Sequence, residues 1–541
     1  MKKSDFPDCM FFSRKTSFFC VEKKAGVPYN KSNIGGGERS SVKNFGKVFC
    51  YREADAITVY WNKPYTASAG LSYLVRDDAG HVAEVVKTHA RLENLLPEHS
   101  YRIDVHVYGD NGKGKTLIGV FTPHTVKTCR RKEDIYVTAE EFGIVGDGKT
   151  LNTDRIQKVI DSCRPDQRIV FPEGIYLTGA LRLHSDMELH LQKGAVLRGT
   201  DEVKDYEPKI KSRFEGIEMD CYSSLINIGE LDHSAACRCK NVILAGEGTI
   251  ESGGKILAER VMERERQRLR ADLERRREEV LACENENTIP GRARPRLIQI
   301  SNAKNIRISG LTLKNGASWN VQMIYSDQVL TDHCTFFSEG VWNGDGWDPD
   351  SSTNCMIFAC EFYTGDDAIS IKSGKNPQGN RINRPAKHIR IFDCKSMSGH
   401  GITIGSEMSG GVRDVSVWDC DMEKSLYGVE IKATPKRGGY VKNIRVRDCI
   451  VPRVLIHSVS YNDDGIPAES APLFSDFIFS NLEITGKCTE KDGTIHACKA
   501  VELIGFEEEG HEIRDVHFRG GKIRGGIRIE KCSGVTFRNM E

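Results

Sequence analysis

The sequence predicts an all-β fold in which a right-handed parallel β-helix follows a small β-sandwich. Short β-rich segments recur from about residue 135 onward, and one cysteine closes several of them in phase. The 51 glycines against 17 prolines suit a chain with many tight turns. A length of 541 residues exceeds one ordinary domain, but a solenoid can extend this far. We expect an N-terminal leader segment at 1–45, the sandwich at 46–130 and the β-helix at 131–541, with a helical insertion at about 255–285.

Alternating apolar residues predict the strands of the sandwich. Residues 56–61 and 101–108 both alternate in this way, and Trp61 belongs to the inward face of the first segment. A Leu-Pro pair shortly before Tyr101 resembles the tyrosine corner of fibronectin type III domains. The resemblance covers roughly residues 46–128 and implies a spacer domain without chemistry of its own.

The β-rich segments in the second half of the chain keep a cysteine in the same phase. Successive cysteines are 26, 34, 26 and 29 residues apart, which suits the unequal coils of a parallel β-helix. They are Cys334, Cys360, Cys394, Cys420 and Cys449. Because no CxxC pair accompanies them, we interpret them as a stack of small buried side chains and not as a metal site.

Two segments depart from the β pattern. Residues 152–163 have apolar side chains at helical spacing, with Asn152 or Thr153 as the N-cap, and predict a helix over one end of the solenoid. Residues 258–282 are dense in Glu and Arg and predict an inserted, solvated helix with i,i+4 ion pairs. We interpret the insertion as an exposed decoration, with a lid or an oligomer contact as the alternative.

Charge and cysteine usage exclude several classes of protein. The 77 Lys and Arg balance 76 Asp and Glu, so we expect neither a nucleic-acid nor a membrane partner. The first twelve residues lack the apolar segment of a signal peptide, and the distribution of the 18 cysteines is not that of a small disulfide scaffold, which favours a reducing compartment. The sequence therefore predicts a cytoplasmic protein, or a periplasmic or secreted one if a leader has been removed.

Polar side chains recur beside glycines on consecutive coils. They are Asp345, Asp366 with Asp367, His400 and, slightly later in its segment, Lys432. Asp366 and His400 each follow their cysteine by six residues, and Asp345 precedes Asp366 by 21 residues, about one coil. Stacking gathers the set into one patch, because neighbouring coils are about 4.8 Å apart. Turn formation would explain any one of these sites, but not three in register.

Such a patch has the groups that glycoside hydrolysis needs. Like charges held close resist simultaneous ionisation, so one carboxyl should keep a proton at neutral pH while its neighbours stay ionised. A proton donor that faces carboxylates able to hold a water can cleave a glycosidic bond. We expect this chemistry to use neither a metal nor another cofactor.

Four blocks in this order resemble the signature of the polygalacturonase family, glycoside hydrolase family 28. They are Asn343-Gly344-Asp345, Gly365-Asp366-Asp367, Gly399-His400-Gly401 and Ile431-Lys432. The resemblance spans roughly residues 137–541 and implies a right-handed parallel β-helix. By position it implies that Asp366 is the general acid and that His400 supports its protonation. It also implies that Asp345 and Asp367 hold and activate the attacking water, with inversion at the anomeric carbon.

Seven residues are expected to bind a pectic oligosaccharide such as an oligogalacturonide. They are Lys432, Tyr461, Asn343, Glu430, Lys436, Arg437 and Glu407. The family usually has arginine where this chain has Glu430, and an anion there would repel a uronate. We expect Lys432, Lys436 and Arg437 to compensate, while the exact sugar at the cleavage point stays open.

The resemblance is to bacterial exo-type members with a fibronectin-like domain, which implies exo action from the non-reducing end on α-1,4-galacturonosidic bonds. The segments 255–290, 375–384 and 406–409 could supply the wall that blocks one end of such a cleft. Alternatives are a rhamnogalacturonan or xylogalacturonan hydrolase, a non-catalytic carbohydrate-binding β-helix, and a calcium-dependent pectate lyase. The lyase would need an arginine as its base, and no arginine stands at the coil position that the Gly-Asp residues share. The oligomeric state stays open.

Overall fold

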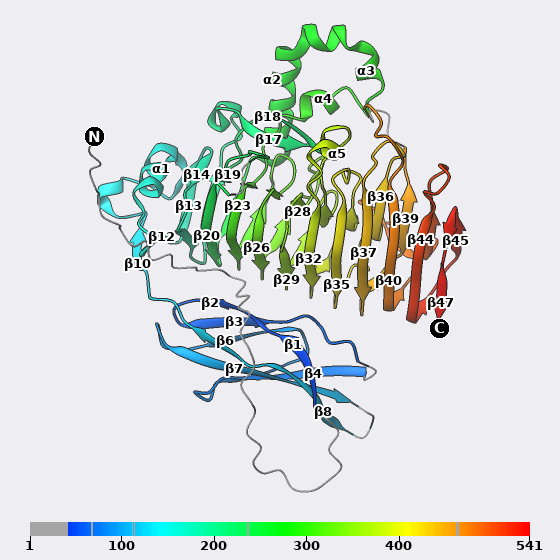
Figure 1. The fold of residues 1–541 in the computed structure, drawn as a ribbon. Coiled ribbons are helices and arrows are strands. Elements are labelled where there is room, and N and C mark those ends of the chain that lie inside the picture. The colour runs from blue at the N-terminus through cyan, green and yellow to red at the C-terminus, as the bar shows by residue number, and fades with distance from the viewer. Residues whose placement is uncertain (1–41, 67–68, 111, 113, 235–236, 461–464) are drawn as a thin grey trace, which may run out of the picture. The chain divides into compact units, whose positions relative to one another are not determined.

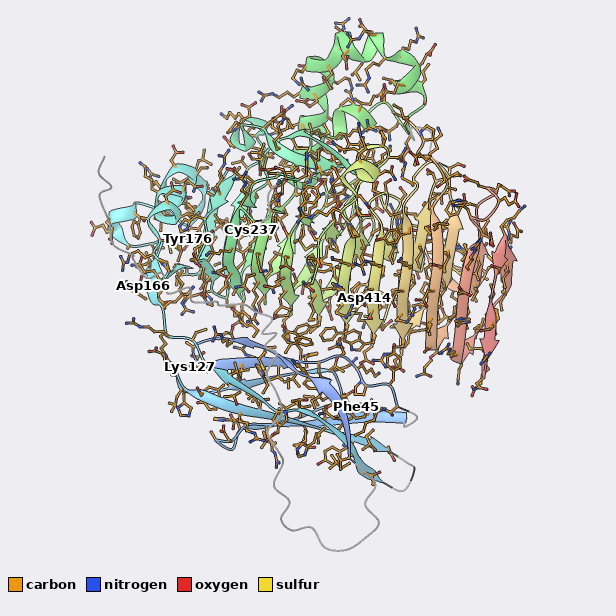
Figure 2. The ribbon with its side chains drawn as sticks, in the orientation of Figure 1. Phe45, Lys127, Asp166, Tyr176, Cys237 and Asp414 are labelled. Carbon is orange, nitrogen blue, oxygen red and sulfur yellow. A yellow bond between two sulfur atoms is a disulfide. The ribbon has the colours of Figure 1, made fainter. Side chains whose placement is uncertain are left out.

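The computed structural model describes residues 42–66, 69–110, 112, 114–234, 237–460 and 465–541. The chain divides into two compact units, residues 1–131 and 132–541. The first described strand, β1, begins at Lys43, inside the segment that the sequence assigns to the leader. Only Phe45 of this short polar strand packs inward, with its ring centroid 6.1 Å from that of Phe121 (Figure 2), so alternation gave no signal there.

The first unit contains two β-sheets. One sheet contains β1 (Lys43–Lys47), β8 (Lys115–Thr122), β7 (Ser100–Asp110), β4 (Ala69–Arg76), β5 (Val82–Val85) and β9 (His124–Lys127). The other contains β2 (Phe49–Arg52), β3 (Ala56–Tyr60) and β6 (His89–Glu93). Trp61 and Tyr73 pack edge to face in the core of this first unit. The Tyr101 hydroxyl accepts a hydrogen bond from the Leu96 amide at 2.7 Å, which is the contact of a tyrosine corner. Assignment to the fibronectin type III class stays a prediction.

The second unit is the predicted parallel β-helix, in which each coil adds a strand to long parallel sheets (Figure 1). The first sheet contains β10 (Glu133–Tyr136), β12 (Gln167–Phe171), β15 (Met187–Leu191), β20 (Cys239–Gly246), β23 (Ala303–Ser309), β26 (Asp327–Asp332), β29 (Met356–Phe358), β32 (Ala386–Phe392), β35 (Val412–Trp418), β37 (Tyr440–Arg447), β38 (Ile450–Val451), β40 (Leu473–Ile484), β44 (Ile513–Ile523), β46 (Cys532–Ser533) and β47 (Thr536–Arg538). The second contains β11 (Asp147–Leu151), β13 (Gly174–Thr178), β16 (Ala195–Gly199), β21 (Thr249–Glu251), β24 (Thr312–Lys314), β27 (Thr335–Phe337), β30 (Glu361–Tyr363) and β33 (Lys395–Ser396).

The third sheet positions the site. It contains β14 (Leu181–Leu183), β19 (Ile226–Gly229), β22 (Ile298–Ser301), β25 (Val321–Ile324), β28 (Trp347–Asp350), β31 (Ile369–Ile371), β34 (Gly401–Ile404), β36 (Gly428–Ala433), β39 (Val454–Ser458), β43 (Val501–Ile504) and β45 (Ile527–Glu530). Two hairpins extend from the coils, β17 (Ile210–Phe214) with β18 (Ile217–Cys221), and β41 (Lys487–Thr489) with β42 (Ile495–Ala497).

The predicted cysteine stack is present in the core of the β-helix. All five of its cysteines are buried, and the Cys360 and Cys449 sulfurs accept hydrogen bonds from the amides of Cys334 and Cys420 on the preceding coils. Aromatic rings stack between coils in the same way, as Phe392 does on Trp418 with centroids 4.5 Å apart. The same kind of buried side chain is therefore repeated at the same position of successive coils, as expected of a solenoid.

Helix α1 (Thr153–Ser162) packs on β13 and β14 at the N-terminal end of the array through Ile156, Val159 and Ile160. Asn152 occupies the N-cap position, but its side chain bonds the Val145 backbone and not the helix. The predicted side-chain cap is therefore wrong, because a nearer partner takes the amide. Two 3₁₀ turns, η1 (Glu140–Phe142) and η2 (Val203–Tyr206), and helix α5 (Gln378–Ile382) complete the connections.

The insertion forms helices α2 (Gly254–Arg275), α3 (Arg277–Leu281) and α4 (Thr288–Gly291), which project from one edge of the β-helix beside β17 and β18 (Figure 1). The predicted ion pairs are present along α2, for example between Arg270 and Glu274 at 3.2 Å. Buried Glu265 anchors α2, because it accepts from Lys209 at 2.7 Å and pairs with Arg268. Among the described residues, no helix combines the length and apolar character that crossing a membrane requires.

Candidate active site

The pairing register of the third sheet stacks polar residues from successive coils. Trp347 of β28 pairs with Ile369, which pairs with Ile402, which in turn pairs with Val429. The residues two positions earlier form a column of Asp345, Asp367, His400 and Tyr427, with Asp366 beside it. The patch that the cysteine phase predicts is therefore present on adjacent coils, but the strand register aligns His400 with Asp367 and leaves Asp366 one residue out of register.

His400 links the two neighbouring aspartates. Its Nδ1 lies 2.8 Å from Asp366 Oδ1 and 3.2 Å from Asp367 Oδ1. Asp367 also accepts hydrogen bonds from Thr403 Oγ1 at 2.8 Å and Ser370 Oγ at 2.9 Å. The Asp366 side chain is 22% exposed against 7% for Asp367, so Asp366 is the carboxyl more open to a substrate.

These contacts set the charges of the pair. Burial would raise the pKa of Asp367, but Lys432 and the His400 hydrogen bond hold it well below its usual range. Burial would lower the pKa of His400, yet its contacts with both carboxylates raise it to about 9. At neutral pH an imidazolium therefore faces an ionised Asp367.

Asp345 shares a buried lysine with a carboxyl that the sequence did not assign to the catalytic set. Lys372 Nζ donates to Asp345 Oδ2 at 2.9 Å and to Asp348 Oδ2 at 3.0 Å, and all three side chains are at most 5% exposed. Burial raises the pKa of Asp345 well above its usual range and that of Asp348 to about 7, against the charge of Lys372. The raised carboxyl expected in the patch is therefore found in this pair. The sequence contained a signal for Lys372, because the alternation Ile369-Ser370-Ile371-Lys372 puts Lys372 on the same face of the strand as Ser370, which contacts Asp367.

Glu430 has a different role from the one expected. Its side chain is 3% exposed, and its two oxygens lie 2.8 Å from Lys432 Nζ and 2.8 Å from His457 Nε2. Burial would raise the pKa of Glu430, but Lys432 and His457 lower it. The carboxylate therefore orients Lys432, which lines the cleft, and does not itself line it.

The other predicted substrate contacts divide into three groups. Asn343, Glu407 and Arg437 line the cleft, although the Arg437 guanidinium is already bound to Asn376 Oδ1 at 2.7 Å and Ser406 O at 3.0 Å. Lys436 is exposed and outside the cleft lining, because the chain turns there before β37. Tyr461 lies outside the described residues.

The three aspartates, His400 and Lys432 line a cleft of about 590 Å³. Segments far apart in the sequence form its sides: Glu215 comes from the β17–β18 turn, Glu284 and Thr288 from the insertion, and Lys375 from the loop before α5. The insertion is therefore more than the exposed decoration that we favoured, because its final turn reaches the cleft. Loop residues carry no period, so the sequence gave no signal for them.

One cluster has ligand atoms close enough to hold a cation. Single ligand atoms of Asp366, Asp367 and His400 all lie within 4.8 Å of one another. In the structure His400 Nδ1 contacts both carboxylates, at 2.8 Å and 3.2 Å, and a metal-bound imidazole would have to give up the proton of that nitrogen.

The His400 contacts predict a pH-dependent stability. The folded pKa of about 9 exceeds the unfolded value near 6.5, so the stabilisation is complete below pH 6.5 and is lost as the pH rises to 9. We expect the free energy of unfolding to fall by up to about 3 kcal/mol over this window. Urea denaturation of the wild type and His400→Gln at several pH values measures it. Parallel pH profiles for the two proteins would contradict this assignment.

Known proteins share the sequence pattern and the fold of this chain. The profile of Glycosyl hydrolases family 28 matches residues 232–540. An exo-poly-alpha-D-galacturonosidase of Dickeya chrysanthemi is 27% identical over 88% of this chain and 81% of its own length. The exopolygalacturonase of Thermotoga maritima superposes with a TM-score of 0.62 at 26% identity, over 76% of this chain and 93% of that one. The family 28 exopolygalacturonase of Yersinia enterocolitica shares the fold, with a TM-score of 0.72 at 23% identity over 91% and 94%. Because the profile covers more than half of the 541 residues, the chain belongs to glycosyl hydrolases family 28 and is a glycosidase.

Proposed function

We propose that this glycosidase hydrolyses the α-1,4 bonds of galacturonides with inversion and releases sugars from the non-reducing end. The observation that carries the proposal is the column of Asp345, Asp367 and His400 with Asp366 beside it, at a cleft that cations also line. A galacturonide brings one carboxylate per sugar, and Lys432, Arg292 and Lys375 line the same cleft. The name of the Dickeya relative agrees with this substrate class.

The proposed reaction divides the work among the three aspartates. Asp366, the more exposed of the His400 partners, gives its proton to the leaving glycosidic oxygen. A water held by Asp345 and Asp367 attacks the anomeric carbon from the opposite face, which inverts the configuration. Asp345 takes the proton of that water, because the Lys372 ammonium at 2.9 Å stabilises the ionised form of Asp345 that can accept it. Exchange with solvent then returns a proton to Asp366 and removes one from Asp345.

The walls of the cleft support exo action. Glu284 and Thr288 come from the insertion and Glu215 from the β17–β18 turn, segments that precede the catalytic coils in the chain, and Ser406 and Glu407 come from the loop after β34. Each of the three segments that the sequence suggested as a wall contributes at least one lining residue. A chain end seated against the insertion would place the first linkage at Asp366.

Product analysis over time tests this proposal. We expect a polygalacturonate chain to release galacturonic acid alone at early times, with the β anomer formed first, as seen by mass spectrometry and proton NMR. An early ladder of mixed oligomers would refute exo action. Rhamnogalacturonan and xylogalacturonan fragments in parallel reactions would reveal the two alternative substrates by faster release. An unsaturated product would indicate a lyase instead.

We propose the cytoplasm as the site of action, with the periplasm or the cell exterior as the alternative, which the Cys488–Cys498 disulfide among the described residues favours. Most of the free cysteines are buried, so burial protects them in any compartment. A disulfide is more typical of an oxidising compartment. Fractionation of cells that produce the protein tests the location, and recovery outside the cytoplasm would reject it.

A further inference from the structure

A short hairpin brings one more lysine to the cleft. Strands β41 and β42 extend from the coil between β40 and β43, and the turn between them carries Lys491. Lys491 lines the same cleft as Asp366 and His400. The catalytic residues stand at β28, β31 and β34, so the hairpin reaches back toward them from a later coil.

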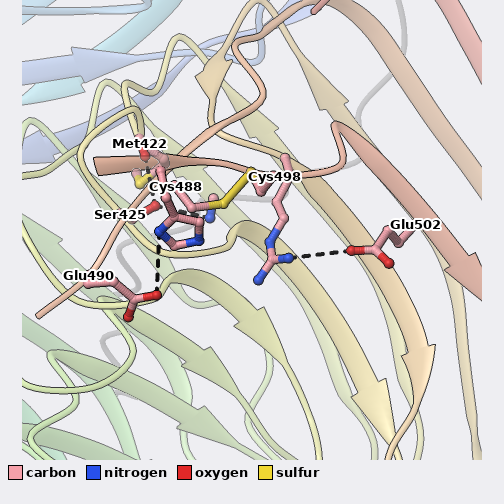
Figure 3. Close-up of a disulfide and its surroundings, with 9 residues drawn as sticks. Met422, Ser425, Cys488, Glu490, Cys498 and Glu502 are labelled. Carbon is pink, nitrogen blue, oxygen red and sulfur yellow. Dashed lines mark hydrogen bonds and ion pairs between the residues drawn. A yellow bond between two sulfur atoms is a disulfide. The ribbon is translucent and has the colours of Figure 1, made fainter. Parts of the chain in front are cut away.

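Besides its disulfide, the hairpin is held by an exposed ion pair between Glu490 and His496 and by the backbone hydrogen bonds of its turn. Cys488 is buried, whereas residues 490–497 are exposed, and the strands share only three residue pairs. An isolated two-stranded hairpin of this kind is marginally stable in water. The Cys488–Cys498 bond closes its base beside Ser425, whose carbonyl accepts from the Thr489 amide at 3.3 Å (Figure 3). The disulfide therefore fixes where the turn lies.

The charge of Lys491 is available to a ligand. Lys372 and Lys432 of the same cleft are already paired, with Asp345 and Glu430 respectively. Within the part of the chain that the structure describes, no carboxylate lies within ion-pair distance of Lys491. A cation that faces a cleft without a partner is suited to an anionic group of the substrate.

The order of the coils assigns Lys491 to one side of the cleaved bond. Thr288 belongs to α4, whose Gly291 adjoins the Trp342 ring shortly before Asp345, so this end of the insertion borders the first catalytic coil. The hairpin of Lys491 contacts Ser425, which precedes β36 and follows β34, so the hairpin borders the opposite, C-terminal side of the catalytic column. A substrate whose non-reducing end meets the insertion extends its remaining sugars toward this hairpin.

We propose that Lys491, positioned by the Cys488–Cys498 disulfide, binds the carboxylate of a sugar beyond the cleaved bond and so favours longer chains. This inference rests on the proposed galacturonide substrate. Reduction by a dithiol breaks the sulfur–sulfur bond: the two sulfurs gain two electrons and two protons, and the dithiol is oxidised to a cyclic disulfide. The turn then loses its closure, and the contribution of Lys491 to binding is lost with it.

Steady-state kinetics on galacturonides of two to six sugars test the inference. The proteins are the full-length wild type, Lys491→Gln, and the double variant Cys488→Ser with Cys498→Ser, the wild type with and without dithiothreitol. We expect Lys491→Gln to lower kcat/KM by less than about twofold on the dimer and by about fivefold or more on the longest chain, through KM. The double variant and the reduced wild type should show the same dependence on length. The matched control is Lys487→Gln, because Lys487 is an exposed lysine of the same hairpin outside the cleft. It should leave kcat/KM unchanged on both the dimer and the longest chain.

The outcomes separate the inference from the proposed function. A wild type that hydrolyses no galacturonide would overturn both. A wild type that hydrolyses every length, with Lys491→Gln either unchanged or equally impaired on all of them, would overturn the subsite alone. Length dependence lost in Lys491→Gln but kept in both the double variant and the reduced protein would overturn the positioning role of the disulfide.

Discussion

Replacing Asp366 with asparagine is expected to lower kcat by about 10³- to 10⁴-fold while the protein stays folded. The amide keeps the shape of the carboxyl but has no proton to give to the leaving oxygen. Asp366 is the more exposed partner of His400, at 22% against 7% for Asp367, and its contact with the imidazole at 2.8 Å is not part of the buried core. Loss of rate without loss of structure is therefore the expected signature.

The measurement is kcat on trigalacturonate, with circular dichroism and thermal melting of the same samples. Glu361→Gln is a matched control, because it makes the same carboxylate-to-amide change at an exposed position on β30, outside the cleft. It should retain wild-type kcat. Near-normal turnover by Asp366→Asn would reject Asp366 as the acid, and the raised pKa of Asp345 would then make Asp345 the next candidate.

The fold and the catalytic column were predictable because both depend on a repeated phase. Cys360 precedes Asp366 by the same six residues that separate Cys394 from His400. Stacking then brings the two residues into contact at 2.8 Å, although the pairing of Ile369 with Ile402 places Asp367, and not Asp366, in register with His400. A solenoid allows this step because neighbouring coils are about 4.8 Å apart wherever their phases match.

The rest of the cleft was less predictable because its groups lie between the strands or act through side-chain geometry. Glu284 and Lys491 reach the cleft from an insertion and a hairpin, whose lengths obey no period. Glu430 seemed to oppose an acidic substrate, yet Lys432 and His457 both bind its carboxylate. The spacing of residues in the sequence predicts the position of each one along the β-helix axis, but not which neighbouring side chain its charge will contact.

The other large effect is expected from Lys372→Met, which should lower the free energy of unfolding by about 3–5 kcal/mol near pH 8.5. The lysine is 5% exposed and lies 2.9 Å from Asp345 and 3.0 Å from Asp348. Its removal leaves two buried carboxyl groups with no cation between them. Activity should be lost as well, because Asp345 then has nothing to hold its oxygen in place or to keep it ionised.

The pH dependence distinguishes this mechanism from lost packing. Burial already raises the pKa of both carboxyls, that of Asp348 to about 7, and removing the lysine raises both pKa values further. Because the carboxyls of the variant keep their protons to a higher pH than those of the wild type, the stability difference should be largest near pH 8.5 and shrink as the pH falls through 7 toward about 6. Adding Asp348→Asn should recover part of the loss at pH 8.5, because the amide is neutral at every pH. Urea denaturation at both pH values measures these differences, with Lys387→Met on β32 as the control. A deficit that stays constant or grows on acidification would show that the methylene chain of Lys372, and not its ammonium, stabilises the site.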